Sequence, residues 1–204
     1  KALPELACFD ASGRESLYHV YLSPSQAAEG ANWEPRAGIV LETRERLDSQ
    51  MENLAQMREI WTRATNVFGR SVVPRIFDGI HHHGPSQNYT ARYLAHFPVG
   101  AEADYAFATI SENASFLLVD GRPVAEWPGW HDVHGGLRGE HHGTVRLKPG
   151  IHSLEYFRVQ ASLNSVAEVA WRLPGKERFE LMTAQAFAPV AVFRPVDWAA
   201  AAAS

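Results

Sequence analysis

Histidine is the most unusual chemical component of this sequence. Ten histidines are present, and seven of them fall in three short, loop-like segments: His81, His82, His83, His131, His134, His141 and His142. Imidazole binds transition metals and titrates near neutral pH, so loops that bring these segments together would form a metal site or a pH-sensitive site. The sequence has no H-E-x-x-H motif or equivalent helical pair to fix two ligands on one face. Solvated or hydrogen-bonded histidines are the simpler interpretation, and a histidine-dependent metal enzyme is kept only as a third hypothesis.

A second group of candidate residues lies in the glycine-containing segment 126–132. This segment places Trp127 and Trp130 beside His131 and Asp132. Aromatic faces stack on the apolar faces of sugar rings, while Asp and His side chains hydrogen-bond hydroxyl groups. We expect Trp127 to pack in the core, and Trp130 either to cap a loop cluster or to face a ligand.

Signatures of catalysis are missing from the sequence. There is no G-x-S-x-G elbow, no Walker-type loop and no G-x-G-x-x-G motif after a strand. Cys8 is the only cysteine, so an intrachain disulfide and a thiolate metal site are both excluded. Glu112, Asp120, Glu126 and Asp132 lie within twenty-one residues of one another, but acids gather in the turns of any β protein. We therefore expect a protein without enzymatic activity.

Composition narrows the class of protein further. The 204 residues carry a formal net charge of −4, with 46% hydrophobic and 21% charged residues, which predicts a globular chain with a sizeable core. No run of about 18 apolar residues and no unusually basic face is present, so neither membrane insertion nor nucleic-acid binding is expected. The chain starts at Lys1 without a basic-then-apolar leader, and its alanine-rich end resembles a linker. These ends suggest a processed or excised segment of a larger protein.

An amphipathic helix is the main element expected in the first third of the chain. Apolar residues recur there at steps of three, four and seven, which predicts a helix over about 49–68. Ser49 and Glu52 should form a capping box at its start, and Gly69 should end it. A lone short helix is marginal in water, so its apolar stripe should dock on neighbouring strands. The stripe consists of Leu47, Met51, Leu54, Trp61 and Phe68.

Alternation with a period of two replaces the helical pattern after residue 70, which predicts a mainly β fold, an antiparallel β-sandwich or barrel. The alternating runs are 89–97, 105–109, 115–119, 123–127, 143–148, 151–160 and 166–172. Turn signals such as Asp120-Gly121 separate them. We expect three parts: an N-terminal extension of strands and helix (1–70), the sandwich (71–190) and a C-terminal strand or linker (191–204). The expected core face carries Tyr105, Phe107, Leu117, Val119, Phe157, Val169 and Trp171.

Residues 105–121, with the sequence YAFATISENASFLLVDG, resemble the central motif of the protective-antigen-type domain. That motif is a Y-x-F strand followed by S-D-D-x-S-x-L-x-[IV]-D-G, and it is shared by fungal flocculins, GLEYA adhesins and some bacterial glycosidases. Residues 144–152 resemble the family's next hairpin, and residues 170–175 resemble its x-W-x-x-P-G strand end. The resemblance covers about Val72 to Pro189. It implies an antiparallel β-sandwich that is usually one module of a larger secreted or cell-surface protein and often binds carbohydrate.

The resemblance also implies a place for a metal ion. In sugar-binding members, two aspartates of the motif hold a calcium ion that also accepts sugar hydroxyls. The matching residues here are Glu112 and Asn113, which offer oxygen ligands but one negative charge fewer, so calcium is expected to bind weakly if at all. Asp120, in the D-G pair of the motif, is expected to set a turn rather than to bind a ligand.

These observations predict a non-catalytic, extracytoplasmic binding module, located in the periplasm, at the cell surface or in the secreted fraction. Its expected partners are a glycan or another cell-surface component, and the flanking domains of a larger chain. The alternative is a structural spacer or protein-interaction module with no small-molecule ligand. The residues expected to contact a ligand are Glu112, Asn113, Trp130, His131 and Asp132.

Overall fold

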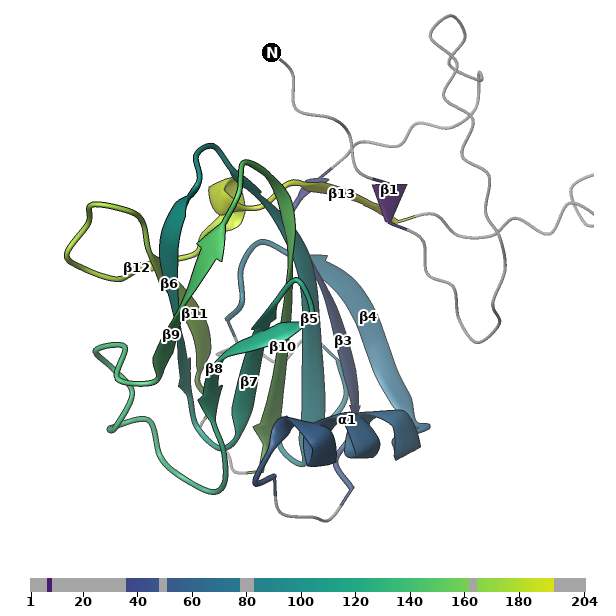
Figure 1. The fold of residues 1–204 in the computed structure, drawn as a ribbon. Coiled ribbons are helices and arrows are strands. Elements are labelled where there is room, and N and C mark those ends of the chain that lie inside the picture. The colour runs from purple at the N-terminus through teal and green to yellow at the C-terminus, as the bar shows by residue number, and fades with distance from the viewer. Residues whose placement is uncertain (1–6, 9–35, 48–50, 78–82, 162–164, 193–204) are drawn as a thin grey trace, which may run out of the picture.

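The computed structural model describes residues 7–8, 36–47, 51–77, 83–161 and 165–192. Two β-sheets face each other in a sandwich (Figure 1). The larger sheet has the order β4-β3-β5-β10-β7-β8, and the smaller has the order β12-β11-β6-β9. All pairs within these two sheets are antiparallel. The expected fold class, a mainly β antiparallel sandwich, is confirmed.

The six strands of the larger sheet are β3 (Ile39–Glu45), β4 (Val67–Val73), β5 (Tyr89–Val99), β7 (Ser115–Val119), β8 (Arg122–Trp127) and β10 (Gly150–Gln160). The smaller sheet consists of β6 (Ala103–Ser111), β9 (His142–Leu147), β11 (Ala167–Arg172) and β12 (Glu180–Leu181). Three short strands form a third sheet beside the sandwich: β1 (Ala7–Cys8), β13 (Pro189–Val192) and β2 (Arg36–Ala37). A short 3-10 helix (Ala184–Ala186) leads into β13.

Strand pairing in the larger sheet crosses the expected boundary at residue 70. Strand β3 pairs with both β4 and β5, so residues before and after that point share one sheet. The division of the chain into an extension and a sandwich stays a prediction, but β3 and β4 contribute directly to the sandwich.

The space between the two sheets holds the main core. Side chains alternate along the strands, and Tyr105, Phe107, Leu117, Val119 and Val169 all point into this core, as the sequence predicted. Trp171 lies at its margin, partly buried, with its ring centroid 6.2 Å from that of Phe97.

Phe157 is the exception among the expected core residues. Its neighbour Tyr156 points between the sheets, whereas Phe157 lies on the opposite face of β10, in a second apolar cluster. A helix covers the outer face of β10, so both faces of this strand carry apolar side chains. The alternation of residues along the strand therefore does not show which face meets the other sheet.

That helix, α1 (Leu54–Arg63), is shorter than the predicted span of 49–68. Its N-cap is Asn53, whose side-chain oxygen accepts a hydrogen bond from the backbone N–H of Gln56 at 3.0 Å. Ser49, the expected capping residue, lies outside the described residues. Gly69 does not end the helix, because it belongs to β4. The chain is already paired with β3 from Val67 onward.

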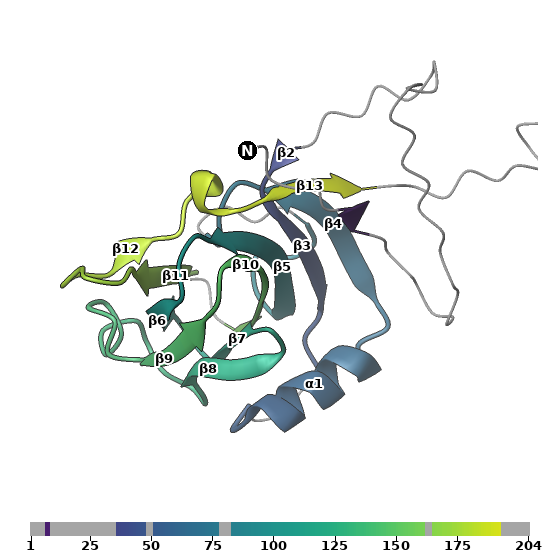
Figure 2. The ribbon, with the colours of Figure 1, turned by 45° about the horizontal axis from the view of Figure 1, so that its top comes forward.

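Helix α1 lies across the outer face of the larger sheet (Figures 1 and 2), so the expected docking on the sandwich is confirmed. The Trp61 and Phe157 rings meet edge to face, with centroids 5.7 Å apart. The second cluster contains Met51, Met57, Ile60, Trp61, Ala114, Phe116, Leu118, Phe157 and Val159, with Leu47 and Leu54 packed against it. Phe68, the last member of the predicted stripe, instead packs against the core between the sheets.

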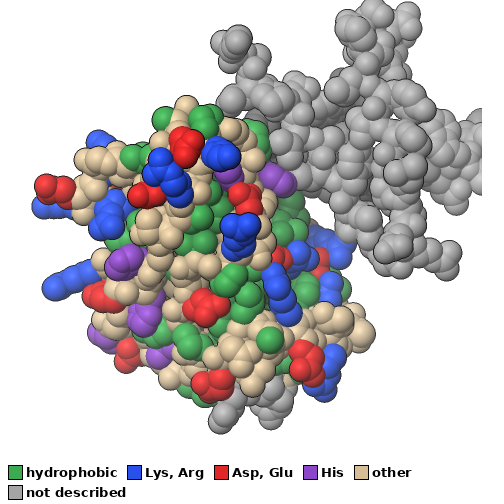
Figure 3. Space-filling view, viewed as in Figure 1, with side chains coloured by type: hydrophobic (Ala, Val, Ile, Leu, Met, Phe, Trp, Pro, Cys, Tyr) green, Lys and Arg blue, Asp and Glu red, His purple; other side chains and the backbone are tan. Residues whose placement is uncertain are grey.

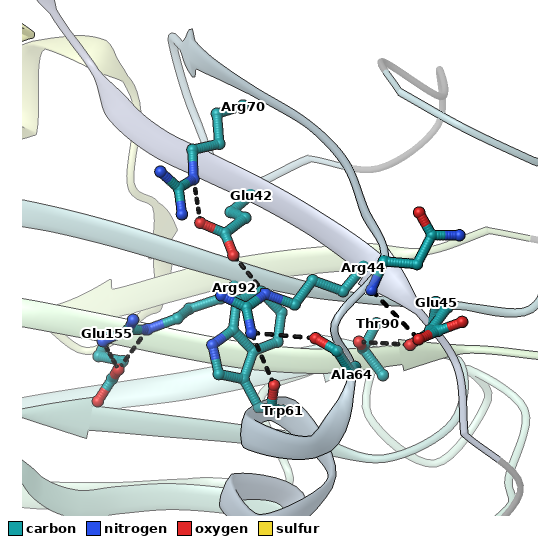
Figure 4. Close-up of polar contacts among 10 residues, drawn as sticks. Glu42, Arg44, Glu45, Trp61, Ala64, Arg70, Thr90, Arg92 and Glu155 are labelled. Atoms are coloured by element: carbon teal, nitrogen blue, oxygen red, sulfur yellow. Dashed lines mark hydrogen bonds and ion pairs between the residues drawn. The ribbon is translucent and has the colours of Figure 1, made fainter. Parts of the chain in front are cut away.

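Arg44 on β3 fastens the C-terminal end of α1 (Figure 4). It donates hydrogen bonds to the carbonyls of Trp61 at 2.9 Å and Ala64 at 3.2 Å, and its guanidinium lies 4.4 Å from the Trp61 ring centroid. The last carbonyls of a helix lack partners within the helix, so a cation there stabilises them. Glu42 pairs with both Arg44 and Arg70, which holds the cation in place.

Among the described residues, no helix is long and apolar enough to cross a membrane.

Candidate functional site

Two loops meet at the end of the sandwich where β6 passes into β7. The turn after Ser111 contacts the long β8–β9 loop, because the Asn113 N–H donates to the His131 carbonyl at 3.0 Å. The Glu112 N–H donates to the Val166 carbonyl, also at 3.0 Å, which ties the same turn to the segment before β11. The structure therefore brings Glu112 and Asn113 next to His131, as their joint assignment to one site requires.

Asn113 is held in the turn by its burial and by its backbone conformation. Its side chain is buried, with 6% of the residue exposed, and its backbone has a φ of 65°. Asn tolerates this left-handed conformation better than most residues, which explains its place in the turn. Its carbonyl accepts a hydrogen bond from Ser111 Oγ at 2.9 Å, and its Nδ2 is buried without a hydrogen-bond partner among the described residues. A role for Asn113 in ligand binding stays a prediction.

The residues of this turn do not fit a calcium site. Calcium takes about six to eight oxygen ligands, with several from carboxylates, and Glu112 is the only carboxylate in the turn between Ser111 and Ala114. Across the described ranges, no group of three or more His, Cys, Asp or Glu side chains is placed to hold a metal ion. His81 and His82, which belong to the third histidine segment, lie outside the described residues, so the histidine-dependent metal enzyme stays an untested hypothesis.

Trp127, at the end of β8, is buried as expected, but histidine rings flank it on both sides. The His131 ring stacks on one face, with centroids 3.8 Å apart and planes 2° from parallel. The His141 ring stacks at 3.9 Å and 13°. Gly136 lies so close to the indole that a Cβ there would be 2.0 Å from Trp127 Cζ3. The indole thus joins the two ends of the β8–β9 loop.

Several histidines of the molecule gather on the side where this loop lies (Figure 3). Burial, and after it the electrostatic interaction with His131, lowers the pKa of His141 below its ordinary value. His131 Nε2 lies 3.2 Å from the Trp127 carbonyl, which holds the ring in the stack. Two of the three histidine segments noted in the sequence therefore have a structural role in one loop.

Trp130 lies beyond this stack and turns part of its indole to solvent, with 47% of the residue exposed. The Arg46 guanidinium lies 5.4 Å from its ring centroid, and Arg46 Nη2 donates to Asn88 Oδ1 at 3.0 Å. Asp132 is exposed and accepts a hydrogen bond from the His134 N–H at 2.9 Å. This end of the sandwich therefore combines an accessible aromatic face with polar groups beside it.

Sequence reasoning missed Arg46 and Asn88. Arg46 follows β3 and Asn88 precedes β5, so neither residue is near the 126–132 segment in sequence. The pairing of Glu45 with Tyr89 in the sheet sets them side by side. Two isolated polar residues at strand ends carry no signal without that register.

No protein-family model matches the chain, and a comparison with curated proteins found no match. Solved structures do match. The PA14 domain of the MpAFP antifreeze protein superposes with a TM-score of 0.62 at 12% identity, covering 81% of this chain and 96% of that domain. The PA14 sugar-binding domain from an RTX adhesin gives 0.59 at 15% identity, with 78% and 100% covered.

This chain has the PA14 fold.

A third match extends the PA14 fold to yeast adhesins. The A domain of epithelial adhesin 9 from Candida glabrata, in complex with Galβ1-4GlcNAc, superposes with a TM-score of 0.53 at 12% identity. It covers 75% of this chain and 89% of that domain. The protective-antigen-type resemblance read from the sequence is thereby confirmed at the level of the fold.

Asp120 lies at the opposite end of β7 from the candidate site and sets a turn, as predicted. Asp120 and Gly121 have φ values of 51° and 73°, the left-handed pair that tight hairpins require. Asp120 Oδ1 accepts from the Ser153 N–H at 2.9 Å, and Oδ2 lies 2.7 Å from His152 Nδ1. His152 Nε2 lies 2.8 Å from the Lys148 carbonyl, so both ring nitrogens have acceptors. This arrangement favours the protonated imidazole.

We expect the Asp120–His152 pair to make stability depend on pH. Burial lowers the pKa of His152, but the hydrogen bonds to Asp120 and Lys148 and the charge of Asp120 outweigh it and raise the pKa. Burial has the opposite effect on the carboxyl group and raises the pKa of Asp120. The hydrogen bonds that Asp120 accepts from His152 and Ser153 outweigh this effect, so its pKa is lowered overall. The pair therefore stabilises the fold most between about pH 4 and 6.5, the unfolded pKa values of Asp and His. The stabilisation is lost when the pH rises through the raised pKa of His152. It is also lost when the pH falls through the lowered pKa of Asp120.

Urea unfolding of the wild type and of His152→Gln from pH 4 to 9 measures this dependence. The variant should lose no more than about 1 kcal/mol near pH 5.5, because Asp120 is half exposed, and the difference should shrink toward pH 9. His134→Gln, which removes an exposed histidine, is the control. A wild-type-to-variant difference that grows with pH would contradict the assignment.

Proposed function

We propose that this chain is a non-catalytic carbohydrate-binding module that works outside the cytoplasm within a larger cell-surface or secreted protein. The observation that carries the proposal is Trp130, a large aromatic side chain left half exposed at the loop end of a PA14 fold. An exposed aromatic face with polar groups beside it suits a sugar, because the indole can stack on the ring while the polar groups hydrogen-bond its hydroxyls. The partners are a glycan or cell-surface component and the flanking domains of the chain.

Support comes from the proteins that share the fold. One is described as a sugar-binding domain, and the yeast adhesin domain was solved with a galactoside. In our proposal the Trp130 face stacks on a sugar ring, and Arg46, held by Asn88, keeps the indole in place. His131, Asp132 and Glu112 supply polar groups for the hydroxyls beside the ring.

A glycan array probed with and without calcium tests the proposal and identifies the sugar. Trp130→Ala should then weaken binding to the best glycan about tenfold or more, because it removes the stacking face. The free energy of unfolding should fall by no more than about 1–2 kcal/mol, since about half of the side chain is exposed and its contact with Arg46 is at the surface. Trp130→Phe, which keeps an aromatic face, should retain most of the affinity. Equal affinity of wild type and Trp130→Ala for every bound glycan would sink the assignment of this site.

The spacer or protein-interaction alternative is favoured by a different observation. Asn113 is buried, and the turn does not fit a calcium ion, so the feature on which sugar binding depends in the resembled family is altered here. An array without any bound glycan, in calcium or in chelator, would favour this alternative.

A further inference from the structure

A groove of about 720 Å³ lies on the outer face of the smaller sheet. Its floor includes Ile110 of β6 and Ala170 of β11, which alternate with residues that point into the core. The β8–β9 loop forms one wall around Gly139, and the segment that leads into β12 forms the other around Phe179. Neither wall contains any residue of the site proposed above.

The walls of the groove are held in place before any ligand arrives. Gly139 has a φ of 79° and approaches Phe179 so closely that a Cβ there would be 2.8 Å from the ring. His142 Nδ1 lies 2.6 Å from the Gly139 carbonyl, and the Arg138 N–H donates to Glu140 Oε2 at 2.8 Å. Such preorganisation lowers the entropy lost when a ligand binds.

Charges of both signs line the groove in equal number. Three guanidinium groups and three carboxylates belong to Arg138, Arg172, Arg178, Glu140, Glu168 and Glu177. An anionic or cationic ligand would face as many like charges as unlike ones. A neutral ligand rich in hydroxyls suits both kinds of group, because each hydroxyl both donates and accepts hydrogen bonds.

Leu137, Leu181 and Phe179 add apolar surface to this polar lining. The Phe179 ring centroid lies 5.0 Å from the Arg172 guanidinium and 5.4 Å from the centroid of the His142 ring. The volume is in the usual range of about 300–1,000 Å³ for small-ligand clefts, so the groove can hold a few sugar units. Apolar ring faces and a dense set of hydroxyls are the two features of an oligosaccharide.

We infer that this groove is a second carbohydrate-binding surface, which takes a neutral oligosaccharide along the outer face of the smaller sheet. The inference rests on the proposed function for its ligand class, but not on the Trp130 site. The β8–β9 loop contributes to both places, so one chain can present two contacts to the same polysaccharide and raise its avidity.

Backbone amide shifts of the isotopically labelled chain test the groove directly. The probes are cellotetraose, maltotetraose and tetra-N-acetylchitotetraose, which are neutral, and tetragalacturonic acid, which is anionic. At least one neutral probe should move the amides of residues 137–142 and 177–181, with affinity at least about tenfold higher than that of the anion. Arg178→Ala and Glu177→Gln, both exposed, should each weaken this binding several-fold, and Lys176→Ala, outside the lining, should not.

The same titration separates the two sites. Trp130→Ala should abolish shifts at 112–113 and 130–132 and leave those of the groove, so the Trp130 site and the groove can fail independently. Shifts confined to the Trp130 end, or none at the groove with 10 mM of any neutral probe, would overturn the inference. Tighter binding of the anion, or groove shifts with a mixed-charge peptide alone, would overturn it as well.

Discussion

Phe157→Ala is expected to lower the free energy of unfolding by about 3–5 kcal/mol, the usual cost of deleting a large buried aromatic. Phe157 is 2% exposed and lies opposite Phe116 of β7, beneath α1. Its ring contacts that of Trp61, so the deletion opens a cavity between helix and sheet. Denaturant unfolding followed by circular dichroism measures the change.

A double-mutant cycle shows whether the loss comes from the helix interface. Trp61→Ala and Phe157→Ala remove the two halves of one contact, so their combined loss should be smaller than the sum by about 0.5–1.5 kcal/mol. Leu137→Ala, at an exposed apolar position, should cost less than about 0.5 kcal/mol. Strict additivity of the two deletions would mean that α1 does not rest on Phe157.

Gly143→Ala is expected to cost about 3 kcal/mol, at the upper end of the range for overpacking. A Cβ at this position of β9 would lie 1.8 Å from the Val124 carbonyl oxygen of β8. The obstacle is backbone, so no side-chain rotation relieves it. Strands β8 and β9 belong to different sheets and meet at this corner, so the two sheets would have to move apart. The thermal unfolding midpoint of the purified variant measures the effect.

Gly100→Ala is the matched control, because a Cβ there meets nothing within 4 Å. That change should be neutral or slightly stabilising, since alanine restricts the unfolded chain more than glycine does. If both alanine variants unfold at the same temperature as the wild type, the close approach of β8 and β9 is wrong.

The candidate site could be predicted only in part from the sequence. The expected burial of Trp127 is confirmed, and the assignment of Trp130 and Asp132 to a ligand site stays a prediction. The burial of Asn113 had no signal in the sequence, since it depends on which loop covers the turn, and the loop that contains His131 contacts this one. The groove had no signal in the sequence, because its floor comes from β6 and β11 and its walls come from two loops that are distant in sequence.

Local chemistry in the sequence determined the strands, the Asp120-Gly121 turn and the fold class. The alternation of apolar residues and the conformational preferences of turn residues act over a few residues. Here they agree with the tertiary structure, so they predicted it correctly. Only the tertiary structure decided which face of β10 meets the helix, where α1 gives way to β4, and which histidines stack on Trp127. These features depend on contacts between residues that are far apart in the sequence. Which side chains are buried is therefore decided only when both sheets and the helix have formed.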